Sequence, residues 1–145
     1  MKPFQTVDYH IKSTWHSLAR MYNQIGGKFN ISQAMGYVLL NIEREGTPAS
    51  KIAPLLGMEA TSMSRLLKSL ENNGLIYKKG DENDKRVVRI FLTEEGVLKK
   101  KLAQNVIRKF NETINENIPV EDMAVFFRVI EQINNLTQIY KAENI

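Results

Sequence analysis

Apolar residues recur along this chain with helical spacing, and one pair of strands interrupts that pattern. From residue 4 to residue 28 they return every three or four positions, which places them on one face of a helix. The same spacing predicts a second helix that begins near Ser32, a good N-cap, and closes before Gly46. A third, short helix is expected to open at Thr47-Pro48. Pro54 interrupts its hydrogen bonding, so we expect this helix to be bent or to begin later than Thr47.

The stretch from Gly57 to Gly96 is the most informative. Its first half predicts an amphipathic helix that ends at Asn73-Gly74, with a stripe formed by Met63, Leu66, Leu67 and Leu70. The exposed face is expected to carry hydroxyl, Arg and Lys side chains, namely Thr61, Ser62, Ser64, Arg65 and Lys68. Leu75–Tyr77 and Val87–Leu92 predict two strands joined by the polar turn Lys78–Arg86. A helix, a strand, a basic turn and a second strand predict a winged helix-turn-helix.

Two long helices are expected after this wing. Thr93 is a hydroxyl N-cap for a helix that reaches about Asn117. Its apolar residues are spaced strictly by four, so the stripe winds around the helix and must change neighbours along its length. They are Leu98, Leu102, Val106, Phe110, Ile114 and Ile118. Pro119 then breaks the chain before a last helix over about residues 120–140.

The pattern as a whole predicts a mainly α (α+β) single domain over residues 1–145. Residues 31–96 form its winged helix-turn-helix, and residues 1–30 and 97–145 form a helical region. These flanking helices carry more apolar surface than one small core requires, which favours a symmetric dimer joined through them. The expected dimer contacts are Phe4, Val7, Ile11, Phe126, Phe127, Ile130 and Ile133.

Composition narrows the function classes. The hydrophobic share is 43% and the charged share 25%, as in ordinary globular proteins. A formal charge of +4 permits a polyanionic partner without requiring one. There is no cysteine, which excludes disulfides and thiol-based redox sensing by this chain. The sequence has neither an apolar run long enough for a membrane span nor the apolar core of a signal peptide, so a cytoplasmic location is expected.

Nothing in the sequence indicates catalysis. It contains no glycine-rich phosphate loop and no nucleophile elbow. His10 and His16 are six residues apart, which is unsuitable for sharing a metal ion on a helix, and no acidic cluster accompanies them. We therefore expect neither an enzyme nor a cofactor or metal site.

The chain resembles the MarR family of bacterial transcriptional regulators over nearly its whole length, and two segments carry the resemblance. Residues 47–76 are similar to its helix-turn-helix, a feature shared with many regulators. The segment 81–96, DENDKRVVRIFLTEEG, resembles the family's more specific wing signature, D-x-x-D-x-R followed by a strand and L-T-x-x-G. The resemblance implies a dimer that binds a pseudo-palindromic operator and is often released by a small anionic or phenolic ligand. Pro54 and the missing cysteine depart from the family pattern.

The resemblance and the chemistry of the side chains together assign roles. Arg86 can insert into a narrow minor groove, and Asp84 is expected to hold it from the same side of an extended segment. Arg65 can donate two hydrogen bonds to a guanine, at O6 and N7, and Ser or Thr can contact bases or phosphates. Lys78, Lys79 and Lys85 are candidate phosphate contacts. The resemblance also implies an effector pocket beside the first helices, where the candidates are Trp15, His16, Tyr22 and Tyr37.

Each of these assignments has a simpler alternative. Asp84 and Arg86 can form an exposed ion pair of little energetic value, and aromatic residues at helical spacing are usually core. The leading hypothesis is a homodimeric transcriptional repressor that binds double-stranded DNA. The alternative is a winged-helix dimer that binds protein or RNA without reading an operator. Asp81, Glu82 and Asp84 favour that alternative because they offset the wing's basic charge.

Overall fold

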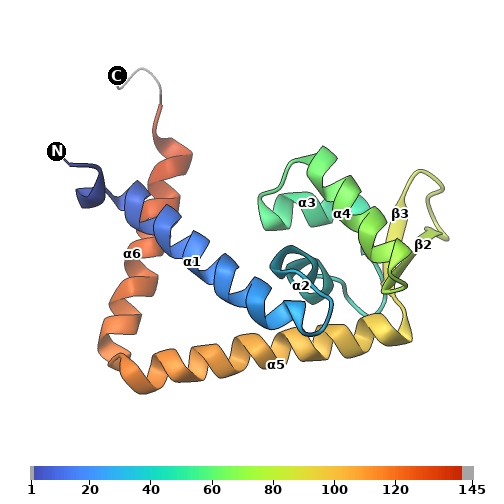
Figure 1. The fold of residues 1–145 in the computed structure, drawn as a ribbon. Helices are drawn as coiled ribbons and strands as arrows, with labels where there is room; N and C mark the ends of the chain where they lie inside the picture. Colours follow the sequence, from blue (N-terminus) through green and yellow to red (C-terminus); the bar gives the residue numbers. More distant parts are fainter. Residues whose placement is uncertain (1, 142–145) are drawn as a thin grey trace. The chain divides into compact units, whose positions relative to one another are not determined.

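The computed structural model describes residues 2–141 and is mainly helical with one small antiparallel sheet (Figure 1). A 3-10 helix, Pro3–Gln5, precedes α1. The helices are α1 Val7–Gly27, α2 Gln33–Leu40, α3 Ala49–Leu56, α4 Ala60–Asn72, α5 Glu94–Asn117 and α6 Val120–Ile139. The strands are β1 Thr47–Pro48, β2 Ile76–Gly80 and β3 Val88–Leu92, in the order β1-β3-β2. The predicted fold class, a winged helix-turn-helix with flanking helices, is confirmed.

The chain forms two compact units. The first extends to Gln104 and holds α1 to α4, the sheet and the first turns of α5. The second begins at Asn105 and holds the rest of α5 together with α6. Among residues 2–141, no helix is long and apolar enough to cross a membrane.

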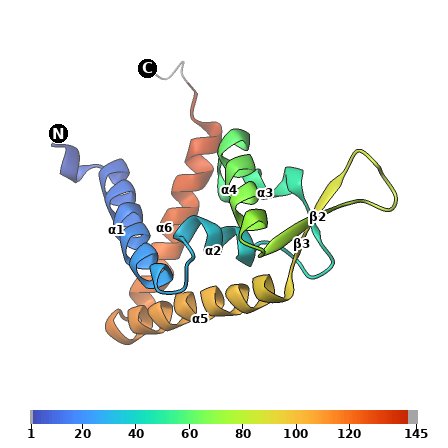
Figure 2. The same ribbon diagram turned by 45° about the vertical axis from the view of Figure 1, so that its right-hand side comes forward.

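The hydrophobic core of the first unit lies between the short helices and the sheet. Its largest fully buried side chains are Val38 and Leu39 from α2, Ile42, Ile52 from α3, Leu70 from α4, and Ile76 and Ile90 from the strands. Full burial of such a side chain contributes about 1.5–3 kcal/mol. In Figures 1 and 2, α4 lies on one side of α2 and the first turns of α5 lie on the other. This core therefore separates the two helices.

Three predicted helix boundaries are confirmed by their caps. The Ser32 hydroxyl accepts a hydrogen bond from the Met35 amide at 3.1 Å, which starts α2. The Thr93 hydroxyl accepts one from the Gly96 amide at 3.0 Å at the start of α5. Helix α4 ends at Asn72, and Gly74 follows with φ of +73°, a left-handed conformation that favours glycine.

Other boundaries differ from the prediction. Helix α1 begins at Val7 rather than at residue 4, because the Thr6 hydroxyl caps it by accepting from the Tyr9 amide. Helix α2 ends at Leu40, well before Gly46. The third helix does not open at Thr47. It begins at Ala49, which confirms the expected later start.

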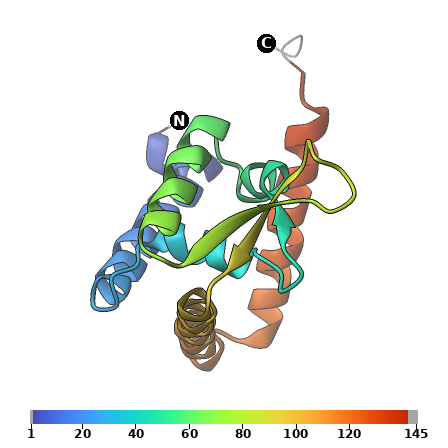
Figure 3. The same cartoon turned by 90° about the vertical axis from the view of Figure 1, so that its right-hand side faces the viewer.

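Thr47 and Pro48 form the short strand β1 instead (Figure 3). Thr47 pairs with Ile90 of β3, and Pro48 pairs with Arg89. A proline is tolerated here because β1 is an edge strand of the sheet, where one amide needs no partner. The predicted turn is also too long, since Lys78 and Lys79 belong to β2.

The first residue of the predicted α5 stripe does not pack against the core, whereas Leu102, the next one, is half-buried. Leu98, the first residue of that stripe, is 65% exposed, whereas Gly96 and Ala103 are buried. A side chain at position 96 would lie 1.9 Å from the Leu75 carbonyl oxygen, so only glycine fits. The ammonium groups of Lys99 and Lys100 donate to backbone carbonyls of Phe29 and Ile42, each at 2.7 Å. Close backbone approach and lysine donors therefore hold this end of α5.

Candidate nucleic-acid interface

Helix α4 is fixed by one apolar side. Met63, Leu67 and Leu70 are buried in the core, and Leu66 packs against it half-buried. This is the predicted stripe, and it is confirmed. Because the stripe is buried, the opposite side of the helix is turned to solvent.

The five residues predicted for the recognition face are all exposed, namely Thr61, Ser62, Ser64, Arg65 and Lys68. They present hydroxyl, guanidinium and ammonium donors along slightly more than two turns of helix. Ser64 also lines an open groove of about 490 Å³ between α3 and α4, to which Ser50 contributes as well. Glu59 occupies the N-cap position of α4 but makes no side-chain cap hydrogen bond. The face is therefore basic and rich in donors.

The wing carries Arg86 at an exposed position beside Asp84. Arg86 Nε lies 3.3 Å from Asp84 Oδ1, and the same oxygen accepts from the Arg86 backbone amide at 3.0 Å. The Arg86 side chain is 92% exposed and that of Asp84 is 42% exposed. The predicted proximity of the two residues is confirmed, and the guanidinium remains available to a partner.

The reason for that proximity differs from the prediction. Residues 84–87 form a turn, closed by the Val87 amide donating to the Asp84 carbonyl at 3.0 Å, so the segment is not extended. The Asp84 carboxylate bonds to the backbone two residues ahead, as Asp side chains do in turns. This contact sets the local backbone and brings the side chain of Arg86 beside Asp84.

Asp81 and Arg89 clamp the base of the wing to the body of the first unit. Arg89 Nε donates to Asp81 Oδ1 at 2.5 Å, and its Nη1 donates to the Gly46 carbonyl at 3.1 Å. Asp81 Oδ2 accepts from the amides of Asn83 and Asp84, each at 3.0 Å. The hydrogen bond from Arg89 is the main cause that lowers the pKa of Asp81, and the backbone amides add to it. We call Asp81, Arg89 and the Gly46 carbonyl the wing clamp.

Arg89 was not singled out by the sequence, although Asp81 belongs to the recognised signature. An Arg in an alternating strand is expected to point to solvent, and its partner Gly46 is 43 residues away. Gly46 has φ of +90°, and a side chain there would collide with the Phe91 ring at 2.6 Å. The only signal for this contact in the sequence was Gly46, a glycine that follows a predicted helix and precedes Thr47-Pro48.

The three wing lysines do not share one surface. All are exposed, but Lys78 and Lys79 are consecutive in β2 and therefore point to opposite faces of the sheet. Lys79 pairs with Arg89, on the face where Tyr77 and Phe91 stack with ring centroids 5.3 Å apart. Lys78 pairs with Ile90, on the face that the core covers. Lys85 lies in the turn.

The predicted effector residues partly assemble. The rings of Trp15 in α1 and Tyr37 in α2 stack at 5.8 Å between centroids. Burial raises the pKa of Tyr22, and the charge interaction with Tyr37 raises it further. His16 is exposed, on the next position of α1. We call Trp15, Tyr22 and Tyr37 the aromatic cluster.

Comparison with known proteins gives one family. The model of the MarR family matches residues 37–88, from α2 to the start of β3. The organic hydroperoxide resistance transcriptional regulator of Bacillus subtilis (strain 168) is 32% identical over 90 residues, which are 61% of this chain and 61% of that protein. The HTH-type transcriptional regulator TtmR of Methylorubrum extorquens (strain PA1) is 32% identical over 82 residues, 56% of this chain and 42% of that protein. The chain thus matches about three fifths or less of the length of these relatives.

Solved structures extend the likeness to nearly the whole fold. The S. aureus MepR–DNA complex has a TM-score of 0.82 at 22% identity, covering 90% of this chain and 97% of that one. A mutant MarR from E. coli complexed with operator DNA has a TM-score of 0.78 at 18% identity, covering 88% and 92%. Streptococcus pneumoniae FabT in complex with DNA has a TM-score of 0.77 at 21% identity, covering 95% and 99%. At these identities the likeness shows the fold alone.

Proposed function

Because this chain belongs to the MarR family of winged-helix transcriptional regulators, we propose that it binds double-stranded DNA in a sequence-specific way as a homodimeric repressor. The observation that carries the proposal is the pairing of a donor-rich α4 face with an exposed Arg86 on the wing. An operator-binding role implies a cytoplasmic protein. We propose no catalytic role.

Helix α4 is proposed to lie in the major groove. Arg65 can make a bidentate contact to guanine O6 and N7, which discriminates by about 1–3 kcal/mol. Thr61, Ser62 and Ser64 can contact bases or phosphates, and Lys68 can neutralise a phosphate. The buried stripe on the other side supports this role, because it fixes the direction of the exposed face.

The wing is proposed to enter the minor groove through Arg86. A narrow minor groove concentrates negative potential, which attracts a guanidinium. Asp84 holds the backbone and the side chain of Arg86 before DNA arrives, so less freedom is lost on binding. The carboxylates of Asp81 and Asp84 contact arginines, and this pairing weakens the case that they repel DNA.

Dimerisation is proposed through the terminal helices. No residue of α6 is buried within the described chain, and Gly26 is the one buried residue of α1. Phe4, Val7, Ile11, Phe126 and Phe127 are exposed in the single chain, whereas Ile130 and Ile133 are half-buried. Such apolar surface is costly in water and suits a self-complementary interface. A two-fold dimer would then place half-sites about one helical turn apart.

Release by a small aromatic or anionic ligand is proposed at the aromatic cluster. The stacked rings of Trp15 and Tyr37 and the Tyr22 hydroxyl offer an apolar surface with donors. Trp15 is the single tryptophan of the chain, so its fluorescence reports directly on occupancy. A phenolic ligand is expected to quench this fluorescence and to weaken DNA binding in the same concentration range.

Selection of bound sequences from a random pool of double-stranded DNA tests the main proposal. We expect a pseudo-palindromic motif with half-sites one helical turn apart. Arg86→Ala should then weaken binding to that motif by about 1–3 kcal/mol for each wing, while circular dichroism and dimer mass stay unchanged. Lys12→Gln, which removes a charge from the exposed side of α1, is the matched control.

Two results would reject the proposal. A pool that yields no enriched motif would favour an interaction module that binds protein or RNA. An enriched motif bound equally well by wild type and Arg86→Ala would leave DNA binding intact but remove the wing from it.

A further inference from the structure

Helix α4 ends in a closed turn that is fixed to the core. The Gly74 amide donates to the Glu71 carbonyl at 3.0 Å, and the Leu75 amide donates to the Leu70 carbonyl at 3.0 Å. This pair of hydrogen bonds, with Gly74 in the left-handed conformation, is the Schellman motif. Leu70 and Leu75 are both buried in the core, so the turn cannot move without the helix.

Thr93 connects this turn to the start of α5. Its hydroxyl donates to the Gly74 carbonyl at 2.6 Å, and its backbone amide donates to the Leu75 carbonyl at 3.1 Å. The same hydroxyl accepts from the Gly96 amide at 3.0 Å and thereby caps α5. One side chain therefore bonds both to the end of α4 and to the first turn of α5. We call Gly74, Leu75, Thr93 and Gly96 the α4–α5 joint.

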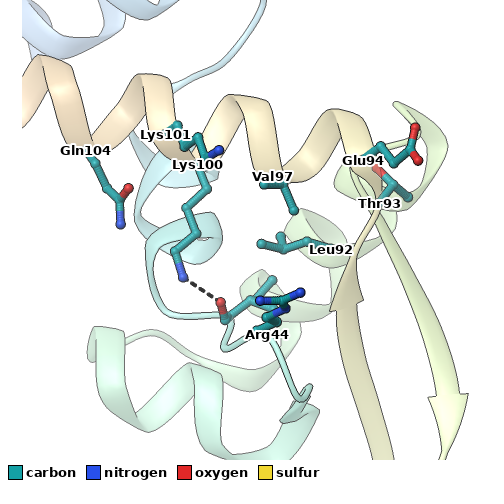
Figure 4. Close-up of a pocket in the computed structure, with 9 residues that line it drawn as sticks. Arg44, Leu92, Thr93, Glu94, Val97, Lys100, Lys101 and Gln104 are labelled. Carbon is teal, nitrogen blue, oxygen red and sulfur yellow. Dashed lines mark hydrogen bonds between the residues drawn. The ribbon is translucent and has the colours of Figure 1, made fainter.

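The joint is also a close contact between backbones. A Cβ added at Gly96 would lie 1.9 Å from the Leu75 carbonyl oxygen, so α5 touches the turn directly. Lys99 and Lys100 also hold α5, but through long side chains, and Figure 4 shows Lys100 extended from the helix toward the loop. A flexible lysine stem can follow a small tilt of the helix, whereas the short side chain of Thr93 cannot. The joint therefore sets the angle between α4 and the first turns of α5.

We propose that Thr93 is a positioning residue that determines which spacing between half-sites the dimer accepts. This role rests on the proposed function, in which α4 reads a half-site and the terminal helices join two chains. Helix α5 is continuous from Glu94 to Asn117, so it carries the angle set at the joint away from α4 toward the expected dimer contacts. Thr93 itself needs no contact with DNA for this role.

The length of α5 makes the spacing sensitive to a small change at the joint. A helix of 24 residues is about 36 Å long. A tilt of about 5° at one end then moves the other end by about 3 Å, which is close to the rise of one base pair. Adding one base pair also turns the second half-site by about 35° around the DNA axis. A rigid joint therefore favours one spacing, and a loose joint tolerates its neighbours.

Substitutions of Thr93 separate the joint from the cap of α5. Thr93→Ser keeps both the donor and the acceptor. Thr93→Asp keeps an acceptor for the Gly96 amide and is a good N-cap, but its carboxylate has no proton to donate to the Gly74 carbonyl. Thr93→Val is close in shape and lacks both. Thr113→Val, at an exposed threonine farther along α5, is the matched control.

The test uses the full chain and the motif selected from the random DNA pool. Four duplexes carry two half-sites at the selected spacing, the same half-sites with one base pair added or removed, or a single half-site. Wild type, Thr93→Ser and Thr113→Val should prefer the selected spacing by about a hundredfold, because a wrong spacing prevents simultaneous engagement. Thr93→Asp and Thr93→Val should prefer it by about tenfold or less. Their affinity for the single half-site should stay near that of wild type.

The proposal is overturned if either Thr93→Asp or Thr93→Val keeps the wild-type preference, or if Thr93→Ser loses it. Weaker binding of Thr93→Asp to the single half-site also overturns it, because the residue would then hold α4 itself rather than its angle to α5. If Thr93→Val does not fold, Thr93→Asp decides alone. Wild type that binds all three two-site duplexes equally overturns the spacing role and leaves the proposed function standing. A pool without an enriched motif rejects both.

Discussion

The two elements proposed to contact DNA are held in place by different forces. Helix α4 is positioned by Met63, Leu67 and Leu70, which are buried in the core. The wing is positioned by polar contacts, with the wing clamp at its base and the Asp84 carboxylate beside Arg86. Burial of apolar area does not depend on pH or salt in the physiological range. The exposed Asp84–Arg86 pair is weak and screened by salt, and the part-buried Asp81–Arg89 pair is screened less.

This difference in anchoring implies that α4 and the wing differ in rigidity. The α4 face is a rigid template, because moving it requires breaking the core. The wing can adjust to the width of a groove, because its contacts are individually small. Changes to the core should therefore alter stability and DNA binding together, whereas changes to the clamp should alter DNA binding with little effect on the rest of the fold.

The largest expected effect is that of Leu70→Ala under the recognition helix. Removing a fully buried Leu side chain should lower the free energy of unfolding by about 2–5 kcal/mol, because transfer energy is lost and a cavity remains. Leu98→Ala, at a position that is 65% exposed, is the matched control and should change stability by less than about 0.5 kcal/mol. Urea unfolding measures both, and equal losses would mean that α4 is not anchored by its stripe.

The next effect is that of Arg89→Met, which removes the bonds to Asp81 and Gly46 while keeping the length of the side chain. The wing must then be ordered when DNA binds, which should weaken operator affinity by about tenfold, the cost of immobilising one or two side chains. Binding curves for wild type, Arg89→Met, Arg86→Ala and the double variant measure the coupling. If the two losses simply add, Arg89 does not act through Arg86.

A smaller effect should follow from the lowered pKa of Asp81. Because its carboxyl holds a proton less tightly in the folded protein than in the unfolded chain, Asp81 stabilises the fold above the ordinary carboxyl pKa. That contribution is lost as the pH falls through the lowered pKa, in the acid range below about pH 4. Asp81→Asn should therefore flatten the acid side of the stability profile, as measured by urea midpoints between pH 6 and pH 3. Glu82→Gln, which removes the neighbouring charge, is the control and should leave the acid side of the profile steep. If Glu82→Gln flattens the profile as much as Asp81→Asn does, the effect comes from the general charge of the wing and not from the Asp81–Arg89 pair.

The same contrast, between the apolar packing of α4 and the polar contacts of the wing, explains which features could be predicted from the sequence. The α4 stripe and the caps at Ser32 and Thr93 were predictable, because helical periodicity and capping are local and involve residues within a few positions of one another. The proximity of Asp84 and Arg86 was predictable for the same reason. Its mechanism was not, because a turn and an extended segment can both bring residues two apart together.

Contacts between distant segments were not predictable. Strand β1 has only two residues and exists through its pairing with Ile90 and Arg89, more than forty positions later. The bond from Arg89 to Gly46 spans a similar separation. Leu98 was expected to pack, but the close approach of Gly96 to the Leu75 carbonyl rotates α5 so that other residues face the core. Periodicity reports that a helix has an apolar face, but not which part of that face finds a partner.

The smallest expected effects concern the lysines of β2, and they test whether strand geometry controls the wing. Lys78 lies on the face of the sheet that the core and α4 share, whereas Lys79 lies on the opposite face beside the wing clamp and Glu45. Lys78→Ala should weaken binding to specific and non-specific DNA alike. It should also lower the magnitude of the slope of log affinity against log salt concentration by about one, because one phosphate contact is lost. Lys79→Ala should lower that slope by less, since the Glu45 carboxylate lines the same groove and reduces the positive potential there. Equal slopes for the two variants would mean that the wing twists on binding until both faces of its sheet reach phosphates. The wing would then be even more adaptable than its weak polar anchoring, compared with the buried stripe of α4, implies.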